Sequence, residues 1–176
     1  MDRKISIGAI SIPAVGLGTY LCSDEEARVS VAHALKCGYR HIDTAEFYAN
    51  HKGIAAGIKE AGISREEIFI TDKVNPGGLF GQPGRTFEEI QSNMKNMLAQ
   101  LACEYVDLYL IHHAAAKEQR LDQWRALVDL QKQGLAKHIG VSNFSISHLE
   151  EIKVCKQRVK SLTHHSICQT ATLFPA

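Results

Sequence analysis

The chain contains the run V-D-L-Y-L-I at residues 106–111, in which five of the six residues are apolar or aromatic. A strand this apolar is expected to be buried on both faces, which is the usual situation in parallel sheets. Four other strand-like segments accompany it, at residues 14–18, 39–43, 68–73 and 136–141. Segments with helical periodicity lie between them, so the sequence predicts repeated strand–helix units and an α/β fold.

Capping signals mark where these helices begin. Ser23 and Thr86 each open a capping box that a glutamate completes three residues later. Behind Thr86 the apolar residues recur on one helical face, namely Ile90, Met94, Met97, Leu98 and Leu101. Two further helices are expected over residues 50–61 and 121–133, each followed by a glycine stop signal, and Ser147 is expected to cap a fifth.

Five such units suit either a barrel or a doubly wound sheet, and periodicity alone leaves both open. A dinucleotide-binding doubly wound domain carries Gly-x-Gly-x-x-Gly after its first strand. Residues 16–20 read Gly-Leu-Gly-Thr-Tyr and lack the third glycine, which argues against that fold. Upstream, the uncharged run 5–21 partly alternates apolar and polar residues around Gly8. This pattern predicts an N-terminal β-hairpin rather than a secretory leader.

Composition places the chain among ordinary globular proteins, since 45% of its 176 residues are hydrophobic and 22% are charged. The net charge of +1 supplies no basic field that would attract nucleic acid. No run approaches the roughly 20 apolar residues of a membrane span. The five cysteines form an odd number without a Cys-x-x-Cys pair, which favours reduced thiols in a cytoplasmic protein.

Polar residues cluster at the carboxyl ends of the predicted strands, which form one rim in a barrel. They include Thr19, Tyr20, Asp43, Tyr48, Lys73, His112, His113, Ser142 and Asn143. A lysine ammonium beside a tyrosine favours the phenolate form, and an aspartate keeps that lysine charged and oriented. Such a tyrosine acts as a general acid toward a carbonyl oxygen, to which a histidine donates a second hydrogen bond.

Less specific interpretations remain open for several of these residues. Asp43 and Lys73 also suit a structural ion pair at the strand ends, and Tyr48 by itself suits a packed aromatic side chain. His112 and His113 raise the question of a metal site. Neighbours on a strand point to opposite faces, however, and no Cys or carboxylate stands at ligand spacing, so no metal is expected.

Several motifs together closely resemble those of the aldo-keto reductases. The segment GYRHIDTAEFYAN at residues 38–50 is similar to one family signature, and DLYLIH at 107–112 and GVSNF at 140–144 are similar to two more. Residues 17–19 and the strand that ends in Lys73 match in order and spacing. The resemblance implies a (β/α)8 barrel that binds NADP(H) and reduces aldehydes and ketones to alcohols.

The resemblance also implies roles for individual residues. Tyr48 would be the general acid, tuned by Asp43 and Lys73, while His112 would orient the substrate carbonyl. The residues implied for cofactor binding are Gly18, Thr19, Asp43, Ser142 and Asn143. Those implied for a small carbonyl substrate are Tyr20, His112 and His113. Tyr20 and His113 stand where many members have tryptophan, a difference that concerns the shape of the substrate.

The motifs end near Ile152, so residues 1–152 are expected to form a partial (β/α)8 barrel of about five units. Residues 153–176 contain four Lys or Arg and no acidic residue. They are expected to be a divergent basic tail, disordered or mis-spliced. A complete barrel takes about 250 residues, so the resemblance predicts a C-terminally truncated or frameshifted chain.

A five-unit barrel would leave its first and fifth strands as open edges, which favour self-association. Segments that complete the cofactor site in the family would also be missing. The sequence therefore predicts little reductase activity for the isolated chain. Two alternatives stay open, a catalytically inactive truncated product and a regulatory binding partner of a full-length reductase.

Overall fold

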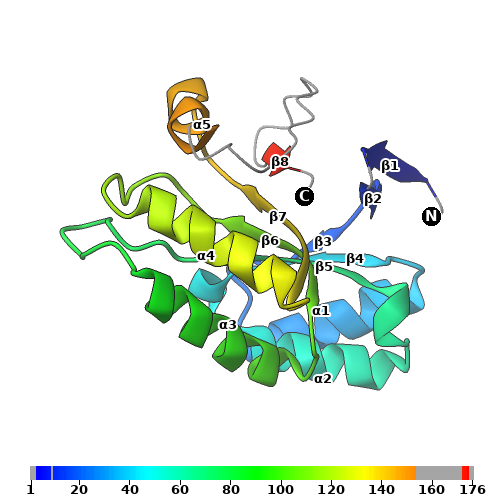
Figure 1. Cartoon of the computed structure of the whole chain (residues 1–176). Coiled ribbons are helices and arrows are strands. Elements are labelled where there is room, and N and C mark those ends of the chain that lie inside the picture. Colours follow the sequence, from blue (N-terminus) through cyan, green and yellow to red (C-terminus); the bar gives the residue numbers. More distant parts are fainter. Residues whose placement is uncertain (1–2, 9, 154–171, 175–176) are drawn as a thin grey trace.

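The computed structural model describes residues 3–8, 10–153 and 172–174 of the chain. Its main sheet has the strand order β3-β4-β5-β6-β7-β8, and β3 to β7 run parallel (Figure 1). These parallel strands are β3 (Leu17–Gly18), β4 (His41–Asp43), β5 (Phe69–Val74), β6 (Val106–Ile111) and β7 (Ala136–Val141). The helices between and after them are α1 (Asp24–Lys36), α2 (His51–Ala61), α3 (Phe87–Leu101), α4 (Arg120–Lys132) and α5 (Ile146–Lys153). This order confirms the predicted α/β fold of about five units, the architecture of a partial barrel.

The N-terminal hairpin is also confirmed. Strands β1 (Lys4–Ile7) and β2 (Ile10–Pro13) pair antiparallel. Gly8, between them, has a φ of 59°, a left-handed conformation that glycine adopts without steric cost. The hairpin forms a separate two-stranded sheet and stands apart from the main sheet in Figure 1.

The prediction of an open edge at the fifth strand is wrong. That strand, β7, pairs antiparallel with β8 (Thr172–Phe174), so backbone groups along its outer edge have partners within the chain itself. Strand β8 lies in the segment 153–176 that the sequence marks as a divergent tail. Residues 154–171 and 175–176 of that segment lie outside the described residues. At the other end of the sheet, β3 has β4 as its one strand partner among the described residues.

The helix caps follow the sequence closely, with one exception. Ser23 and Thr86 form complete capping boxes at the starts of α1 and α3. The exception is α5, which begins before the expected cap at Ser147. The Ser145 hydroxyl instead accepts a hydrogen bond from the His148 backbone N–H, and His148 Nδ1 lies 3.2 Å from the Ser145 backbone nitrogen. A serine and a side chain three residues later still close the cap, two residues earlier than predicted.

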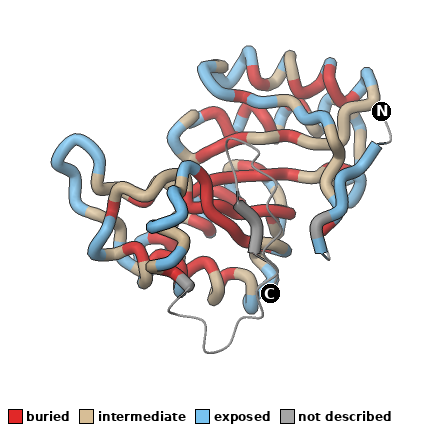
Figure 2. The backbone as a smooth tube through the Cα atoms, turned by 90° about the horizontal axis from the view of Figure 1, so that it is seen from above, coloured by how far each residue is buried: buried red, intermediate tan, exposed pale blue. Residues whose placement is uncertain are grey.

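The core lies between the sheet and helices α1 to α4, which Figure 1 shows on one side of it. All residues of β6 are buried, as its apolar sequence predicts. Figure 2 shows the central strands as nearly continuously buried, while the outer helix faces and the loops are exposed. In the described residues, no helix combines the length and the apolar character needed to cross a membrane.

Helices α1 and α2 meet at a seam with no room for a side chain on one partner. Gly53 is buried in α2, and a Cβ atom there would overlap the backbone carbonyl of Asp24 at the start of α1. The Gly53 backbone N–H also donates a 2.7 Å hydrogen bond to the Asp24 side chain. Because α2 follows the segment that contains Tyr48, this seam fixes where that segment lies.

Candidate active site

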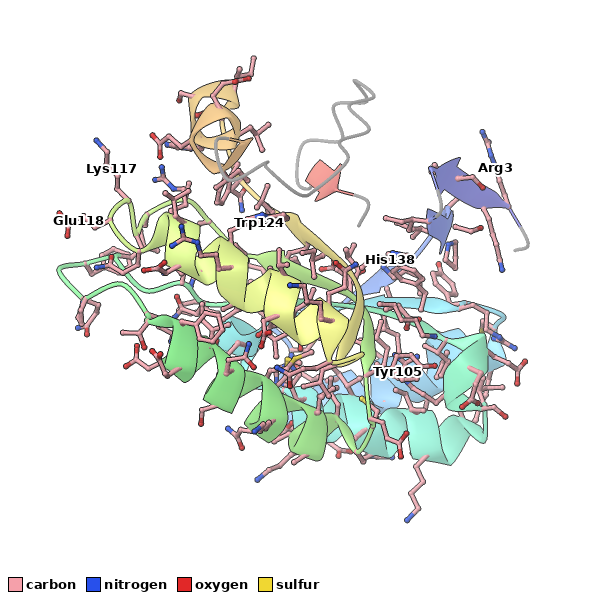
Figure 3. All side chains as sticks on the ribbon, viewed as in Figure 1. Arg3, Tyr105, Lys117, Glu118, Trp124 and His138 are labelled. Atoms are coloured by element: carbon pink, nitrogen blue, oxygen red, sulfur yellow. The ribbon has the colours of Figure 1, made fainter. Side chains whose placement is uncertain are left out.

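The predicted polar rim exists because β3 to β7 are parallel and their carboxyl ends face the same way. Gly18 pairs with Asp43, Asp43 with Thr71, and Lys73 with Leu110. Figure 3 marks the two ends of the sheet: Tyr105 precedes β6, whereas Lys117 lies in the loop that follows it. The candidate residues lie at the end marked by Lys117, which is the carboxyl end of the parallel strands.

Lys73 and Asp43 form the ion pair that the motifs predict. The Lys73 Nζ atom donates to Asp43 Oδ1 at 2.5 Å and to the Thr44 carbonyl oxygen at 2.9 Å. Lys73 is 6% exposed, whereas the Asp43 side chain is 39% exposed. A buried ammonium needs such partners, because burial without them is costly.

Tyr48 lies beside this ion pair. It ends a 3₁₀ helix, η1 (Glu46–Tyr48), which the sequence pattern did not reveal, and Ala49 then turns the chain with a φ of 54°. The Lys73 ammonium is 5.4 Å from the centre of the Tyr48 ring. The ring of His112 packs edge-on at 5.8 Å, and that of Tyr20 lies 5.0 Å away. Three residues that the motifs single out therefore lie around the Tyr48 ring.

His112 is neutral at physiological pH. Burial lowers its pKa to about 4, and the nearby positive charge of Lys73 acts in the same direction. Burial also lowers the pKa of His113. The expectation that these two rings point to opposite faces is wrong, because both line the same cavity and their centres are 6.1 Å apart. They follow the last residue of β6, Ile111, so the alternation of a strand no longer applies. The described residues contain no cluster of three metal-ligating side chains.

A cavity of about 420 Å³ opens beside Tyr48. Five predicted residues line it, namely Tyr20, Tyr48, His112, His113 and Asn143. The rest of the wall, to which no motif points, consists of Phe47, Asn75, Gly77, Leu79, Phe80 and Gln82. None of these described lining residues is a carboxylate, a lysine or an arginine. The volume is that of a site for a small organic molecule.

One wall of the cavity is the loop of residues 75–85. Its base is closed by a bridge between Gly77 and Gly84, and Arg85 forms an ion pair with Glu46 of η1. Its tip carries Phe80, which is 95% exposed. The loop is therefore anchored to the segment that holds Tyr48, while its tip is free of the core.

The residues implied for cofactor binding lie at the same end of the sheet, but not all face the cavity. The Asn143 side chain reaches it and donates to the His112 carbonyl oxygen at 2.9 Å and to the Ser142 hydroxyl at 3.1 Å. Ser142 is buried directly after β7. Gly18 is exposed, whereas the buried Thr19 hydroxyl lies 3.4 Å from Asn50 Oδ1. Neither Gly18 nor Thr19 is among the described residues that line the cavity.

A family model described as the aldo/keto reductase family matches residues 4–170. The chain belongs to the aldo/keto reductase family. The match extends past Ile152, where the recognisable motifs end. Glyoxal reductase of Bacillus subtilis (strain 168) is 43% identical over 144 residues, which cover 81% of this chain and 50% of that protein. Methylglyoxal reductase DkgA of Escherichia coli (strain K12) is 38% identical over 142 residues, with coverage of 80% and 49%.

Solved aldo-keto reductases have the same fold over most of this chain. The enzyme of Brucella melitensis superposes with a TM-score of 0.80 at 36% identity, covering 88% of this chain and 59% of that one. An aldo-keto reductase of Bombyx mori in complex with NADP gives a TM-score of 0.78 at 30% identity, with coverage of 90% and 55%. The chain spans about half the length of the curated relatives it matches.

Proposed function

We propose that the protein is an NADP(H)-dependent reductase that converts small aldehydes and ketones to alcohols, with Tyr48 as the general acid. The observation that carries the proposal is the Lys73 ammonium, held at 2.5 Å by Asp43 and 5.4 Å from the centre of the Tyr48 ring. The relatives named glyoxal reductase and methylglyoxal reductase support small dicarbonyl compounds as substrates.

The residues present fit a nicotinamide ring at this rim. Asn143 lines the cavity and carries an amide, a group that pairs well with a carboxamide, and the buried Ser142 hydroxyl holds that amide in place. The ring of Tyr20 and the open space beside Gly18, where a Cβ atom would meet nothing within 4 Å, leave room for a flat ring. When bound, a reduced nicotinamide supplies the hydride.

The chain itself supplies the proton and the charge balance. The Tyr48 hydroxyl donates its proton to the carbonyl oxygen as that oxygen becomes negative, so the product is an alcohol and Tyr48 becomes a phenolate. The ammonium of Lys73 stabilises the phenolate, and Asp43 holds the ammonium in place. Neutral His112 donates a hydrogen bond from one ring N–H to the same oxygen. Because the Lys73 ammonium is mostly buried, water screens its charge only weakly, and these electrostatic effects are stronger than they would be at the surface.

The test compares Tyr48→Phe with the unvaried protein, whose own turnover is expected to be low, in the NADPH-dependent reduction of methylglyoxal. Loss of a general acid is expected to lower kcat by about a hundredfold or more, while NADPH binding, followed by fluorescence, stays unchanged. Tyr20→Phe is the matched control, because it removes a phenol hydroxyl from the same cavity without removing the proton donor. Equal kcat values for Tyr48→Phe and the unvaried protein would contradict the proposal.

The same assay addresses the non-catalytic alternative. A chain that binds NADPH saturably but shows no turnover with methylglyoxal would contradict the reductase proposal. That result would favour a binding role beside a full-length reductase.

A further inference from the structure

A buried histidine–aspartate pair lies directly behind the Lys73 site. His51 Nε2 is 2.8 Å from Asp72 Oδ2, and the two side chains are 3% and 0% exposed. Replacing a buried ion pair by well-packed apolar residues usually leaves stability unchanged or raises it. The pair is therefore poorly explained as a device for stability, and its other contacts indicate what it positions.

Asp72 and Lys73 are consecutive residues of β5, so their side chains point to opposite faces of the sheet. Lys73 faces Asp43 and Tyr48. Asp72 faces the helix layer, where it meets His51 at the first position of α2. Its second oxygen, Oδ1, accepts a 2.6 Å hydrogen bond from the Lys73 backbone N–H. One carboxylate thus touches both the start of α2 and the peptide group of Lys73.

The residue before His51 links the same helix start to the other strand ends. Asn50 is fully buried, and its Nδ2 donates to the carbonyl oxygens of Thr19 at 2.8 Å and Cys22 at 2.9 Å. Its Oδ1 accepts from the Thr44 hydroxyl at 3.3 Å. The carbonyl oxygen of Thr44 is the second acceptor of the Lys73 ammonium. The start of α2 therefore contacts both Asp72, which bonds the Lys73 backbone, and Thr44, which bonds the Lys73 side chain.

The charges around the pair agree with its geometry. Burial opposes protonation of His51, but the hydrogen bond and charge of Asp72, with Glu46 and Asp24 farther away, outweigh it and raise the His51 pKa. Tyr109 of β6 is the register partner of Asp72 in β5. Burial, and to a lesser extent the charge of Asp72, raises the pKa of Tyr109, so its phenol stays neutral. Among the described residues, His51 is the ion-pair partner of Asp72.

We propose that His51 and Asp72 are positioning residues, whose buried contact fixes the start of α2 against β5 and so holds Lys73 and the segment of Tyr48 in register. Tyr48 precedes His51 by two residues, and Ala49 between them is held in a left-handed conformation. The inference rests on the proposed function, because Lys73 and Tyr48 are there the groups that handle the proton.

The test replaces both charges together, because a single apolar replacement would leave the other buried charge unpaired. The variant His51→Leu/Asp72→Leu is expected to unfold in urea at the same or a higher concentration than the unvaried protein. Its kcat for methylglyoxal is expected to fall about tenfold with KM changed less than about threefold, since a displacement of about 1 Å costs up to a hundredfold. The ammonium resonance of Lys73, observed with ¹⁵N-labelled lysine, is expected to shift.

Two further variants separate positioning from a general effect on stability. Asp72→Asn keeps the shape and the acceptor for the Lys73 backbone N–H, and its amide N–H can donate to Nε2 of a neutral His51. It is therefore expected to retain kcat within about threefold. The matched control Arg65→Leu/Asp107→Leu removes an ion pair at the opposite end of the sheet, and its kcat per folded molecule is expected to be unchanged. If the double leucine variant at 51 and 72 does not fold, His51→Leu/Asp72→Asn, which leaves no buried carboxylate without a partner, gives the same comparison of kcat.

A folded double variant with unaltered kcat and an unaltered Lys73 resonance would overturn the positioning role. The Lys73 resonance also separates this proposal from the reductase proposal. If the unvaried protein shows no turnover, the proposed function fails. A shift of the Lys73 signal in the double variant would still support positioning by His51 and Asp72, and an unshifted signal would exclude it.

Discussion

The Lys73 ammonium meets the Asp43 carboxylate although the two residues are not register partners. Asp43 pairs with Thr71 of β5, so Lys73 lies two residues farther along the same strand and on the same face. The long lysine side chain spans this offset and places its charge next to the Tyr48 ring. The ion pair is therefore a consequence of the parallel register between β4 and β5.

Removing the positive charge of Lys73 tests this arrangement. Lys73→Met keeps the length of the buried side chain, but leaves the Tyr48 phenolate without its counter-charge. We expect kcat to fall by about a hundredfold, comparable to the loss of an acid–base group, with little change in KM. Steady-state kinetics with methylglyoxal checks this, and a kcat within threefold of the unvaried protein would contradict it.

The pKa of His112 can be measured directly. Its imidazole signal in an NMR titration is expected to have a midpoint of about 4, assigned by its loss in His112→Gln. The unfolded chain takes up this proton near pH 6.5, the folded protein only near pH 4. The stability that neutral His112 contributes is thus fully present above pH 6.5 and is lost as the pH falls toward 4. A midpoint close to 6.5 would show that the ring is not desolvated.

The seam between α1 and α2 makes an unusual prediction for a helical glycine. Replacing glycine by alanine in a helix normally stabilises it by about 1 kcal/mol. At Gly53 the new methyl group would overlap the Asp24 backbone, so Gly53→Ala is expected to destabilise the protein by about 2 kcal/mol. Urea denaturation measures this. The exposed Ala56→Gly is the control, expected to cost about 1 kcal/mol through helix propensity alone.

Asp107 is expected to matter for stability and not for catalysis. It is the second residue of β6, at the end of the sheet away from the candidate active site. Its Oδ2 accepts from Arg65 at 2.7 Å and from the Ile70 backbone N–H at 3.0 Å. Asp107→Ala leaves the buried Ile70 N–H without its acceptor and takes the ion-pair partner from Arg65, which keeps the Ile68 and Tyr105 carbonyl oxygens as acceptors. The change is expected to cost about 2–3 kcal/mol in urea denaturation. Lys137, which is half-exposed, forms an ion pair with Asp107 Oδ1 at 3.3 Å. Lys137→Met removes this partner and is expected to cost less than about 1 kcal/mol. A loss of kcat per folded molecule in Asp107→Ala would contradict this assignment.

Features that depend on nearby residues were predictable from the sequence. The caps at Ser23 and Thr86 depend on a residue three positions away, and the burial of β6 depends on its own composition. The roles of Asp43 and Lys73 were predictable because both lie at the carboxyl ends of apolar strands and belong to recognisable motifs. At α5 the local rule gave the wrong serine, because Ser145 and Ser147 both precede a side chain able to close the cap.

Features that depend on how loops fold over one another were not predictable. Phe47 lines the cavity from η1 and Phe80 from the loop of residues 75–85, and no sequence pattern joins them. The contact between His51 and Asp72 forms only when α2 packs on β5, and nothing in the sequence relates the two residues beforehand. Likewise, the fifth strand looks like an edge until Thr172–Phe174 pairs with it.

In the proposed reductase, the loop of residues 75–85 would separate the choice of substrate from the chemistry. Its base is tied to η1 through Arg85 and Glu46, whereas Leu79 and Phe80 at its tip line the cavity without supporting the core. Surface loop tips tolerate insertion and replacement far better than the elements that carry them. Grafting a tip of different size between the Gly77–Gly84 bridge would thus exchange the size of molecule admitted while the proton donor stays where it is. Substitutions at the loop tip could therefore change the substrate of the proposed reductase without disturbing Tyr48 or the core.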